Sequence, residues 1–203
     1  MLDILIGLAA VITGYLLGSI PTAYIMGKLT KGVDIRTVDT GNVGTASTFR
    51  AVGTWQGFVV GAVDIGKGSA AIGAAYALGV SMPWMMGAGF AAFLGHSFPI
   101  FIGFRGGQGA ATIIGIFAAL TFWATLVSCC IILFTMYLNR RIILRRIFFS
   151  ILVGGPTLPI FIWIFYRSWE LVVYSVVIIL FMIWRNWRTV KAPLRQDRYE
   201  RKT

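Results

Sequence analysis

Residues 95–112, GHSFPIFIGFRGGQGAAT, join two apolar runs and contain the only histidine of the chain, His96. The segment ends in Arg105-Gly106-Gly107-Gln108-Gly109 before the second run begins at Ala110. Glycines just before a helix leave backbone N–H groups pointing at an anion, and the helix dipole adds partial positive charge there. The segment therefore predicts a cradle for a phosphate or carboxylate at a membrane edge. A plain loop between two helices is the alternative.

The composition places the chain in a lipid bilayer. Of its 203 residues, 58% are hydrophobic and 12% are charged, and the mean hydropathy is +0.81. This is too apolar for a soluble domain of this length. A spanning helix needs roughly 17–25 mostly apolar residues, so there is room for about six or seven. We expect an all-α polytopic membrane protein with a single integral membrane domain over residues 1–203.

The net charge of +11 is concentrated in four intervals between apolar runs. These intervals are residues 28–50, Arg105, residues 140–146 and the tail from residue 185 onward. Because basic loops stay on the cytoplasmic side, all four are predicted to be cytoplasmic, including a basic carboxy-terminal tail at 184–203. The tail is expected to lie near anionic lipid headgroups. No nucleic-acid partner is expected, because no basic helix of soluble length is present.

The apolar runs predict the helices. They cover residues 4–27, 54–78, 84–104, 110–138, 147–165 and 169–184. The fourth run is predicted to break near residues 120–122, because one continuous helix would place Arg140 on the outer face. Pro21 removes a backbone hydrogen bond from the first helix and is expected to kink it, which marks a place where a cavity can begin.

Residues 32–50 form a polar stretch rich in Gly, Thr, Ser and Asn. Its hydroxyls, the amide of Asn42, backbone N–H groups and Arg50 predict a second anion nest. A solvated loop is the alternative interpretation.

Asp64, Lys67 and His96 lie inside predicted membrane segments. Each charge there costs about 2.5–3.5 kcal/mol on insertion scales, and the i, i+3 spacing of Asp64 and Lys67 allows them to pair. The pair is either purely structural, or Asp64 holds Lys67 so that it donates toward the site. His96 is either a satisfied core residue or a member of that site. The adjacent Cys129-Cys130 is interpreted as packing, and no metal or cofactor site is expected.

Three motifs in order resemble the bacterial glycerol-3-phosphate acyltransferase family that uses acyl phosphate. They are Gly32-Val33-Asp34-Ile35-Arg36 with Thr40-Gly41-Asn42-Val43-Gly44 and Arg50, then Asp64-Ile65-Gly66-Lys67-Gly68, then residues 96–112. The likeness extends from Leu17 to about Asn186. It implies about seven transmembrane helices in the bacterial inner membrane, with the amino terminus outside and the active site facing the cytoplasm. It also implies transfer of a fatty acyl chain from acyl phosphate to the 1-hydroxyl of glycerol 3-phosphate, giving lysophosphatidic acid and phosphate.

The resemblance and the motifs together predict the site residues. The catalytic residues are His96, Asn42 and Asn186. His96 is expected to serve in orientation or proton transfer, and a substrate phosphate is the alternative acceptor of the hydroxyl proton. Those expected to bind the substrates and their phosphates are Thr40, Gly41, Arg50, Lys67, Arg105, Gly106, Gly107 and Gln108. An acyl phosphate carries a good leaving group, so neither a serine nucleophile nor a metal is required. The oligomeric state is left open.

The chain departs from the family pattern at several positions. Gln108 stands where the family has lysine, which removes a cation from the cradle, and Thr45-Ala46-Ser47 replaces Ala-Thr-Asn, which loses an amide. A divergent protein without catalysis, or a membrane binding or transport protein for a small phosphorylated anion, is the alternative function. Broken helices and intramembrane charges also suit a transporter.

Overall fold

The fold is entirely helical in the part of the chain that the computed structural model describes, residues 1–38, 41–138 and 155–185. Its elements are α1 Leu2–Ser19, α2 Thr22–Lys31, α3 Thr45–Ala51, α4 Thr54–Ala77, α5 Met82–Ser97, the 3-10 turn η1 Ile100–Ile102, α6 Ala110–Leu120, α7 Phe122–Leu138, α9 Thr157–Tyr166 and α10 Trp169–Arg185. The predicted all-α class is confirmed. The number of transmembrane helices and the sides on which the termini lie stay predictions.

Among the described residues, three segments are long and apolar enough to cross a membrane: Leu2–Lys31, Thr54–Ala77 and Met82–Ile102. Large hydrophobic side chains are exposed along α1, Leu5 and Ile12 among them. Lipid solvates such side chains, whereas water would not. The exposed apolar surface is therefore the surface expected of membrane helices.

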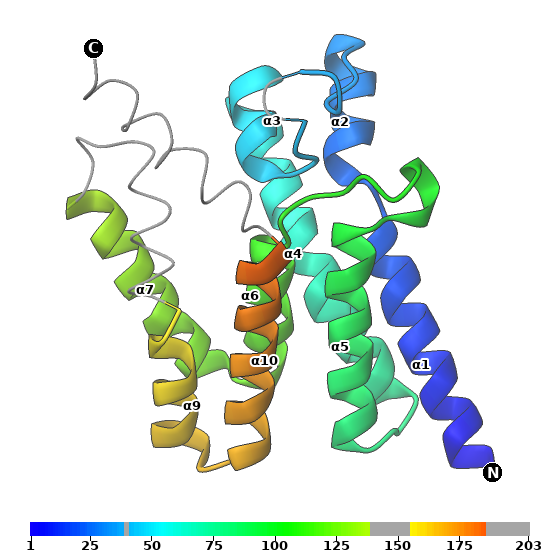
Figure 1. The fold of residues 1–203 in the computed structure, drawn as a ribbon, viewed down its shortest axis with the longest axis vertical. Helices are drawn as coiled ribbons and strands as arrows, with labels where there is room; N and C mark the ends of the chain where they lie inside the picture. Colours follow the sequence, from blue (N-terminus) through cyan, green and yellow to red (C-terminus); the bar gives the residue numbers. More distant parts are fainter. Residues whose placement is uncertain (39–40, 139–154, 186–203) are drawn as a thin grey trace. The chain divides into compact units, whose positions relative to one another are not determined.

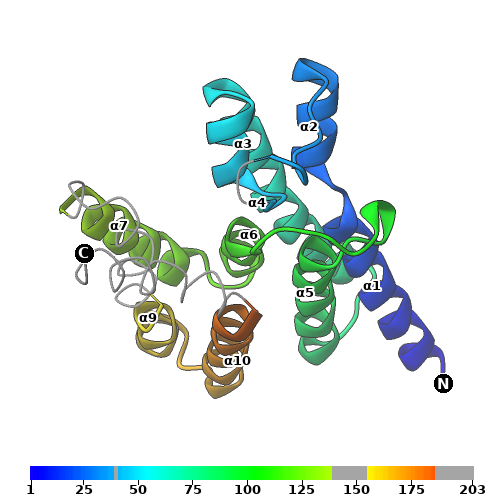
Figure 2. The same cartoon turned by 45° about the horizontal axis from the view of Figure 1, so that its top comes forward.

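The chain divides into two compact units, residues 1–120 and 121–203. In the first unit α1, α4, α5 and α6 pack alongside one another, and α2, α3 and the loop between α5 and α6 lie together at one end (Figure 1). The amino terminus lies at the opposite end of this unit. Turning the view brings the end with α2 and α3 forward (Figure 2). That end thus gathers both loops that the sequence predicts to bind anions. The single domain over residues 1–203 stays a prediction.

Helices of the first unit touch through their backbones at glycines. A Cβ atom on Gly18 of α1 would overlap the carbonyl group of Ala92 in α5, and one on Gly68 of α4 would overlap the carbonyl oxygen of Thr112 in α6. Small residues allow this approach between helices in lipid. Because the contacts involve main chain, they fix how far each of these helices is shifted along its axis relative to its packing partner.

The predicted first helix, residues 4–27, is two helices. The helical path stops at Ile20, whose ψ is 114°, and resumes at Thr22 after Pro21. Proline has no N–H to continue the ladder, and its ring disfavours the helical conformation of the residue before it. The interruption at Pro21 was predicted from the sequence, but a full separation into α1 and α2 was not.

Two further boundaries differ from the prediction. The helix expected to reach residue 104 ends at Ser97, because Phe98 leaves the helical region and Pro99 follows it. Residues 45–51, expected to be loop, form α3, which starts after Gly44. The hydroxyl of Thr48 donates to the carbonyl of Gly44 at 3.1 Å and supports the first turn of α3.

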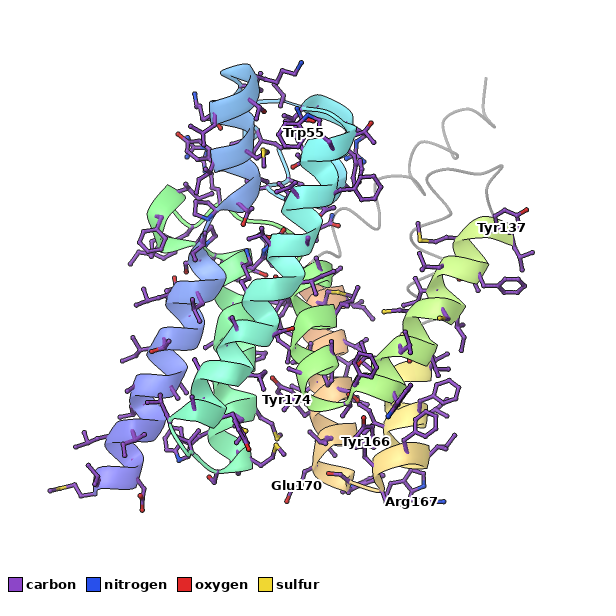
Figure 3. The ribbon with its side chains drawn as sticks, turned by 180° about the vertical axis from the view of Figure 1, so that it is seen from behind. Trp55, Tyr137, Tyr166, Arg167, Glu170 and Tyr174 are labelled. Atoms are coloured by element: carbon purple, nitrogen blue, oxygen red, sulfur yellow. The ribbon has the colours of Figure 1, made fainter. Side chains whose placement is uncertain are left out.

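The second unit contains α7, α9 and α10. The predicted break near residue 120 is confirmed, since α6 ends at Leu120 and α7 begins at Phe122. The gap between the predicted helices 147–165 and 169–184 is a turn, with Arg167 in the left-handed conformation at φ 51°. Figure 3 shows Arg167 and Glu170 around this turn. Cys129 and Cys130 are free thiols on α7. The arginines of 140–146, and the start of the helix predicted from residue 147, fall outside the described residues.

Candidate functional site

An ion pair lies inside α4. The ammonium nitrogen of Lys67 is 2.9 Å from Oδ1 of Asp64, and the two side chains are 4% and 2% exposed. Removing both charges from water is costly, so such a pair persists only with good geometry and additional hydrogen bonds. The predicted pairing of these residues is confirmed.

The break at Pro21 supplies one of those additional bonds. Nζ of Lys67 donates to the carbonyl oxygen of Ile20 at 3.2 Å. This carbonyl has no i+4 amide partner, because the helix is interrupted at Pro21. It accepts from the amide of Thr22 at 3.0 Å and, on its second lone pair, from Lys67. An ammonium has three donors, and within the described part of the chain two of them are accounted for by Asp64 and Ile20. The third can point into the space that Lys67 lines.

His96 lies in the last turn of α5. The predicted helix over residues 84–104 would have placed it about two turns before the end. Its side chain is buried, and Nδ1 is 3.8 Å from Oδ1 of Asp64. This separation is too long for a direct hydrogen bond but short enough for strong electrostatic interaction in a low-dielectric setting. The carboxylate of Asp64 therefore faces both Lys67 and the imidazole.

The glycine-rich loop folds back onto the end of α5. The amide of Gly107 donates to the carbonyl of His96 at 3.1 Å, which satisfies one of the carbonyls that a helix end leaves open. A Cβ on Gly107 would collide with Nε2 of His96 and would lie 2.6 Å from the carbonyl oxygen of Val43. Glycine is thus required at this position. The same hydrogen bond also means that the Gly107 amide is directed at α5 and not at a ligand.

A small cavity lies where these parts meet. Its volume is about 10 Å³, measured over the positions that the centre of a water molecule can take. It is lined by Ile20, Pro21, Thr22, Val43, Asp64, Lys67, His96, Pro99 and Gly106. A space of this size suits about one water molecule. The two predicted anion loops therefore meet here, through Val43 and Gly106, next to the three ionisable side chains Asp64, Lys67 and His96.

The remaining cations lie nearer the surface. Arg50 is an exposed residue on α3 and donates to the buried hydroxyl of Ser47 at 3.4 Å. Arg105 is exposed on the glycine-rich loop and makes no hydrogen bond or ion pair with any residue that the structure describes. Gln108, on the same loop, is partly buried. Ser47 is one of the departures from the family pattern. In the structure its hydroxyl accepts a hydrogen bond from Arg50.

Sequence reasoning missed a clamp between the first loop and η1. Arg36 donates to Oδ1 and Oδ2 of Asp34 at 3.0 and 2.7 Å, and to the carbonyl of Ile102 at 3.3 Å. Its guanidinium also lies 4.9 Å from the centroid of the Tyr24 ring. Hydrogen bonds from Arg36 lower the pKa of Asp34 to about 2. The i, i+2 spacing of an acid and an arginine was the available signal, but nothing in it pointed to Ile102.

The other predicted site residues lie in the first loop or outside the described chain. Gly41 has φ 70°, a conformation that favours glycine, and Asn42 follows it, with its carbonyl accepting from the amide of Gly44 at 3.1 Å. Thr40 and Asn186 fall outside the described residues.

The fold and the site together define a polytopic helical membrane protein whose polar site is built from interrupted helices and a glycine-rich loop. A sequence profile described as "Glycerol-3-phosphate acyltransferase" matches residues 8–196. The chain belongs to the glycerol-3-phosphate acyltransferase family.

Curated relatives agree with this assignment. A glycerol-3-phosphate acyltransferase of Thermosynechococcus vestitus is 36% identical over 201 residues, covering 94% of this chain and 92% of its own length. A protein of the same name from Endomicrobium trichonymphae is 35% identical and covers 95% and 94% of the two chains. The similarity therefore spans nearly the whole of each protein.

A solved structure shares the fold. The crystal structure of PlsY (YgiH), an integral membrane glycerol 3-phosphate acyltransferase in its glycerol 3-phosphate form, superposes with a TM-score of 0.81 and 31% identity. The match covers 94% of this chain and 92% of that chain. A lysophosphatidic acid form of the same protein gives a TM-score of 0.78. Together with its apolar helices, this likeness makes the present chain an integral membrane protein.

Proposed function

We propose that the protein transfers a fatty acyl group from acyl phosphate to the 1-hydroxyl of glycerol 3-phosphate, on the cytoplasmic face of the bacterial inner membrane. The observation that carries the proposal is the meeting of both glycine-rich loops with His96 at one cavity, lined by Val43 and Gly106. A reaction between two phosphorylated substrates needs two anion sites next to one proton acceptor. The cavity is about 10 Å³, so the substrates are expected to bind above it, among the loops.

The reaction needs one bond made and one broken. The 1-hydroxyl oxygen attacks the acyl carbon and forms the ester bond, while the bond from that carbon to the phosphate oxygen breaks and phosphate leaves with the electron pair. We propose that Nε2 of His96 accepts the hydroxyl proton and passes it to the departing phosphate. An imidazole suits this role because its unperturbed pKa lies near neutrality. The products are lysophosphatidic acid and inorganic phosphate.

Positioning is expected to supply much of the rate. Holding two reactants in an aligned geometry is worth roughly 7–11 kcal/mol in intramolecular reactions. We propose that Arg50, Arg105 and the backbone around Gly106 hold the substrate phosphates. Lys67 adds its third N–H donor from below, although Asp64 offsets part of its charge. Thr40, Gly41, Asn42, Gln108 and Asn186 are proposed to complete the substrate contacts.

The proposal is tested with purified protein in lipid nanodiscs, given glycerol 3-phosphate and an acyl phosphate of defined chain length. Release of phosphate and formation of lysophosphatidic acid in equal amounts are expected. Equal rates with acyl-coenzyme A would show that the proposed donor is wrong. Absence of both products, together with flux of glycerol 3-phosphate into protein-containing liposomes, would instead support transport.

Substitutions assign the chemistry to the site. His96→Ala is expected to lower kcat by roughly 10²- to 10⁴-fold, the range of general-base catalysis, and Arg50→Ala is expected to abolish turnover. Lys31→Ala is the matched control for Arg50, because Lys31 is an exposed cation in the last turn of α2. Wild-type rates in His96→Ala or Arg50→Ala would remove that residue from the mechanism.

A further inference from the structure

The guanidinium of Arg36 joins two segments that are far apart in the sequence. On its own loop, Nε and Nη2 donate to the two carboxylate oxygens of Asp34 at 3.0 and 2.7 Å. Its third nitrogen, Nη1, donates to the carbonyl of Ile102 in η1, 66 residues further along the chain. The ring of Tyr24 lies against the same guanidinium, with its centroid 4.9 Å away. One side chain therefore connects α2, the first loop and η1.

Apolar packing reinforces the same junction. The side chain of Ile102 is 7% exposed and belongs to one hydrophobic cluster with Ile35 and Val43 of the first loop. Ile35 is fully buried, whereas the side chains of its neighbours Asp34 and Arg36 are 19% and 31% exposed. The first loop thus holds η1 in two ways: Ile35 packs with the Ile102 side chain, and Arg36 donates to the Ile102 carbonyl.

The position of η1 determines where the glycine-rich loop begins. The amides of Ile102 and Phe104 both donate to the carbonyl of Pro99, at 3.4 and 2.9 Å, so the turn is compact. Pro99 before this turn and Gly106 after it line the cavity, and Val43 lines it from the first loop. A shift of η1 relative to the first loop would therefore change the distance between the two loops at the cavity.

We propose that Arg36 is a positioning residue that sets the spacing between the two loops proposed to hold the substrate phosphates. It acts through the Ile102 carbonyl and not on a substrate. Transfer between two bound molecules depends steeply on their alignment, and a misplacement of about 1 Å can cost roughly 10²-fold in rate. This inference rests on the proposed acyl transfer. The competing account is that Arg36 only stabilises the turn of its own loop.

The shape of the guanidinium allows the two accounts to be separated. Its planar fork reaches a carboxylate with two nitrogens and a carbonyl with the third, whereas the ammonium of lysine is a compact charge on one nitrogen. Arg36→Lys is therefore expected to keep the charge beside Asp34 but to lose the bond to Ile102. The turn itself does not need the guanidinium. The amide of residue 36 donates to Oδ1 of Asp34 at 3.0 Å, and the amide of Thr37 donates to the Asp34 carbonyl at 3.0 Å.

Hydrogen exchange in lipid nanodiscs locates the effect of the substitution. Arg36→Lys is expected to speed the exchange of the Ile102 and Phe104 amides by roughly tenfold, as for the loss of a hydrogen bond from a charged group. Exchange of residues 32–37 is expected to stay near the wild-type rates. Lys28→Gln is the matched control and should change neither segment. Lys28 is an exposed cation in the last turn of α2 whose charge also acts on Asp34.

Turnover shows whether the spacing matters for the reaction. Arg36→Lys is expected to lower kcat by roughly 10- to 10²-fold. The KM values for glycerol 3-phosphate and acyl phosphate should change less, because each loop keeps its own donors. The melting temperature should stay close to that of the wild type, so the lower kcat does not reflect unfolding. Arg36→Gln also removes the charge and is expected to lower kcat at least as far.

Three results would overturn the inference. They are wild-type kcat in Arg36→Lys and Arg36→Gln, unchanged exchange of the Ile102 and Phe104 amides in both variants, and a loss of kcat with faster exchange in residues 32–37 alone. The last result would support the competing account of a local brace.

The two proposals fail in different ways. Wild-type protein without acyl transfer overturns the proposed function, whatever the exchange rates show. Wild-type protein with normal turnover, whose kcat and exchange at η1 do not respond to substitution of Arg36, overturns the positioning role alone.

Discussion

The amide of Gly107 donates to the carbonyl of His96, and this 3.1 Å bond ties the glycine-rich loop to the helix that carries the imidazole. Loop and imidazole therefore cannot move independently by much. A phosphate held by the loop would keep a fixed distance from Nε2, which is what an aligned transfer reaction requires.

Gly107→Ala tests this contact. The added Cβ would collide with Nε2 of His96 and crowd the carbonyl of Val43. Overpacking of this kind costs about 1–3 kcal/mol, so we expect a lower melting temperature and a large loss of kcat. Gly66→Ala is the control, because a Cβ there meets nothing within 4 Å and the site is helical. It should leave activity intact and should not lower stability. Normal activity in Gly107→Ala would contradict the close approach.

Replacing one partner of the intramembrane ion pair should lower the stability of the protein more than replacing both partners. Lys67→Met leaves the carboxylate of Asp64 buried without its partner, and such a change typically costs about 3–5 kcal/mol. The double variant Asp64→Leu/Lys67→Met should recover most of this loss. Thermal unfolding of the three proteins in the same detergent measures the difference. Equal melting temperatures for single and double variants would show that the pair is not energetically coupled.

Gln108→Lys restores the cation that the family pattern carries in the cradle. Hydrogen bonds to charged groups contribute about 1.5–3 kcal/mol against 0.5–1.5 for neutral ones, so a gain of roughly tenfold in kcat/KM for acyl phosphate is expected. Gln108→Met has a similar length without a polar group and should lower kcat/KM instead. If Gln108→Lys and Gln108→Met both behave as wild type, residue 108 lies outside the phosphate site.

The clamp formed by Asp34 and Arg36 should be insensitive to pH over a wide range. Because the pKa of Asp34 is lowered to about 2 from 3.8, the contribution of its carboxylate is fully present above pH 3.8 and is lost as the pH falls through about 2. Hydrogen exchange of residues 32–37, corrected for intrinsic rates, should show the same protection at pH 7 and pH 4. Asp34→Asn should lose protection at both. A loss of wild-type protection at pH 4 would show that Arg36 does not hold the carboxylate.

Local sequence patterns predicted the features that depend on neighbours in the chain. The i, i+3 spacing predicted the ion pair of Asp64 and Lys67, Pro21 predicted an interruption, and the charge pattern predicted the break next to Leu120. Each of these three predictions follows from helix geometry or from the cost of charge in lipid. None of them requires knowledge of the other helices.

Relationships between helices could not be predicted in the same way. Whether His96 faces Asp64 depends on how far α5 is shifted along its axis relative to its neighbours. Main-chain contacts, such as the one between Gly18 and Ala92, determine this shift. The destination of the Gly107 amide likewise depends on where α5 ends. A glycine-rich turn signals backbone freedom, but it does not say which acceptor its N–H groups will find.

Two structural requirements conflict at the Ile20 carbonyl in the first membrane segment. A bilayer favours an unbroken helix, in which that oxygen would point along the helix axis and accept from the amide of Tyr24. At the break beside Pro21 it accepts instead from the amide of Thr22 and from Nζ of Lys67. A substitution at Pro21 that restored a continuous helix would thus take this acceptor away from Lys67, without changing any residue that is proposed to bind a substrate.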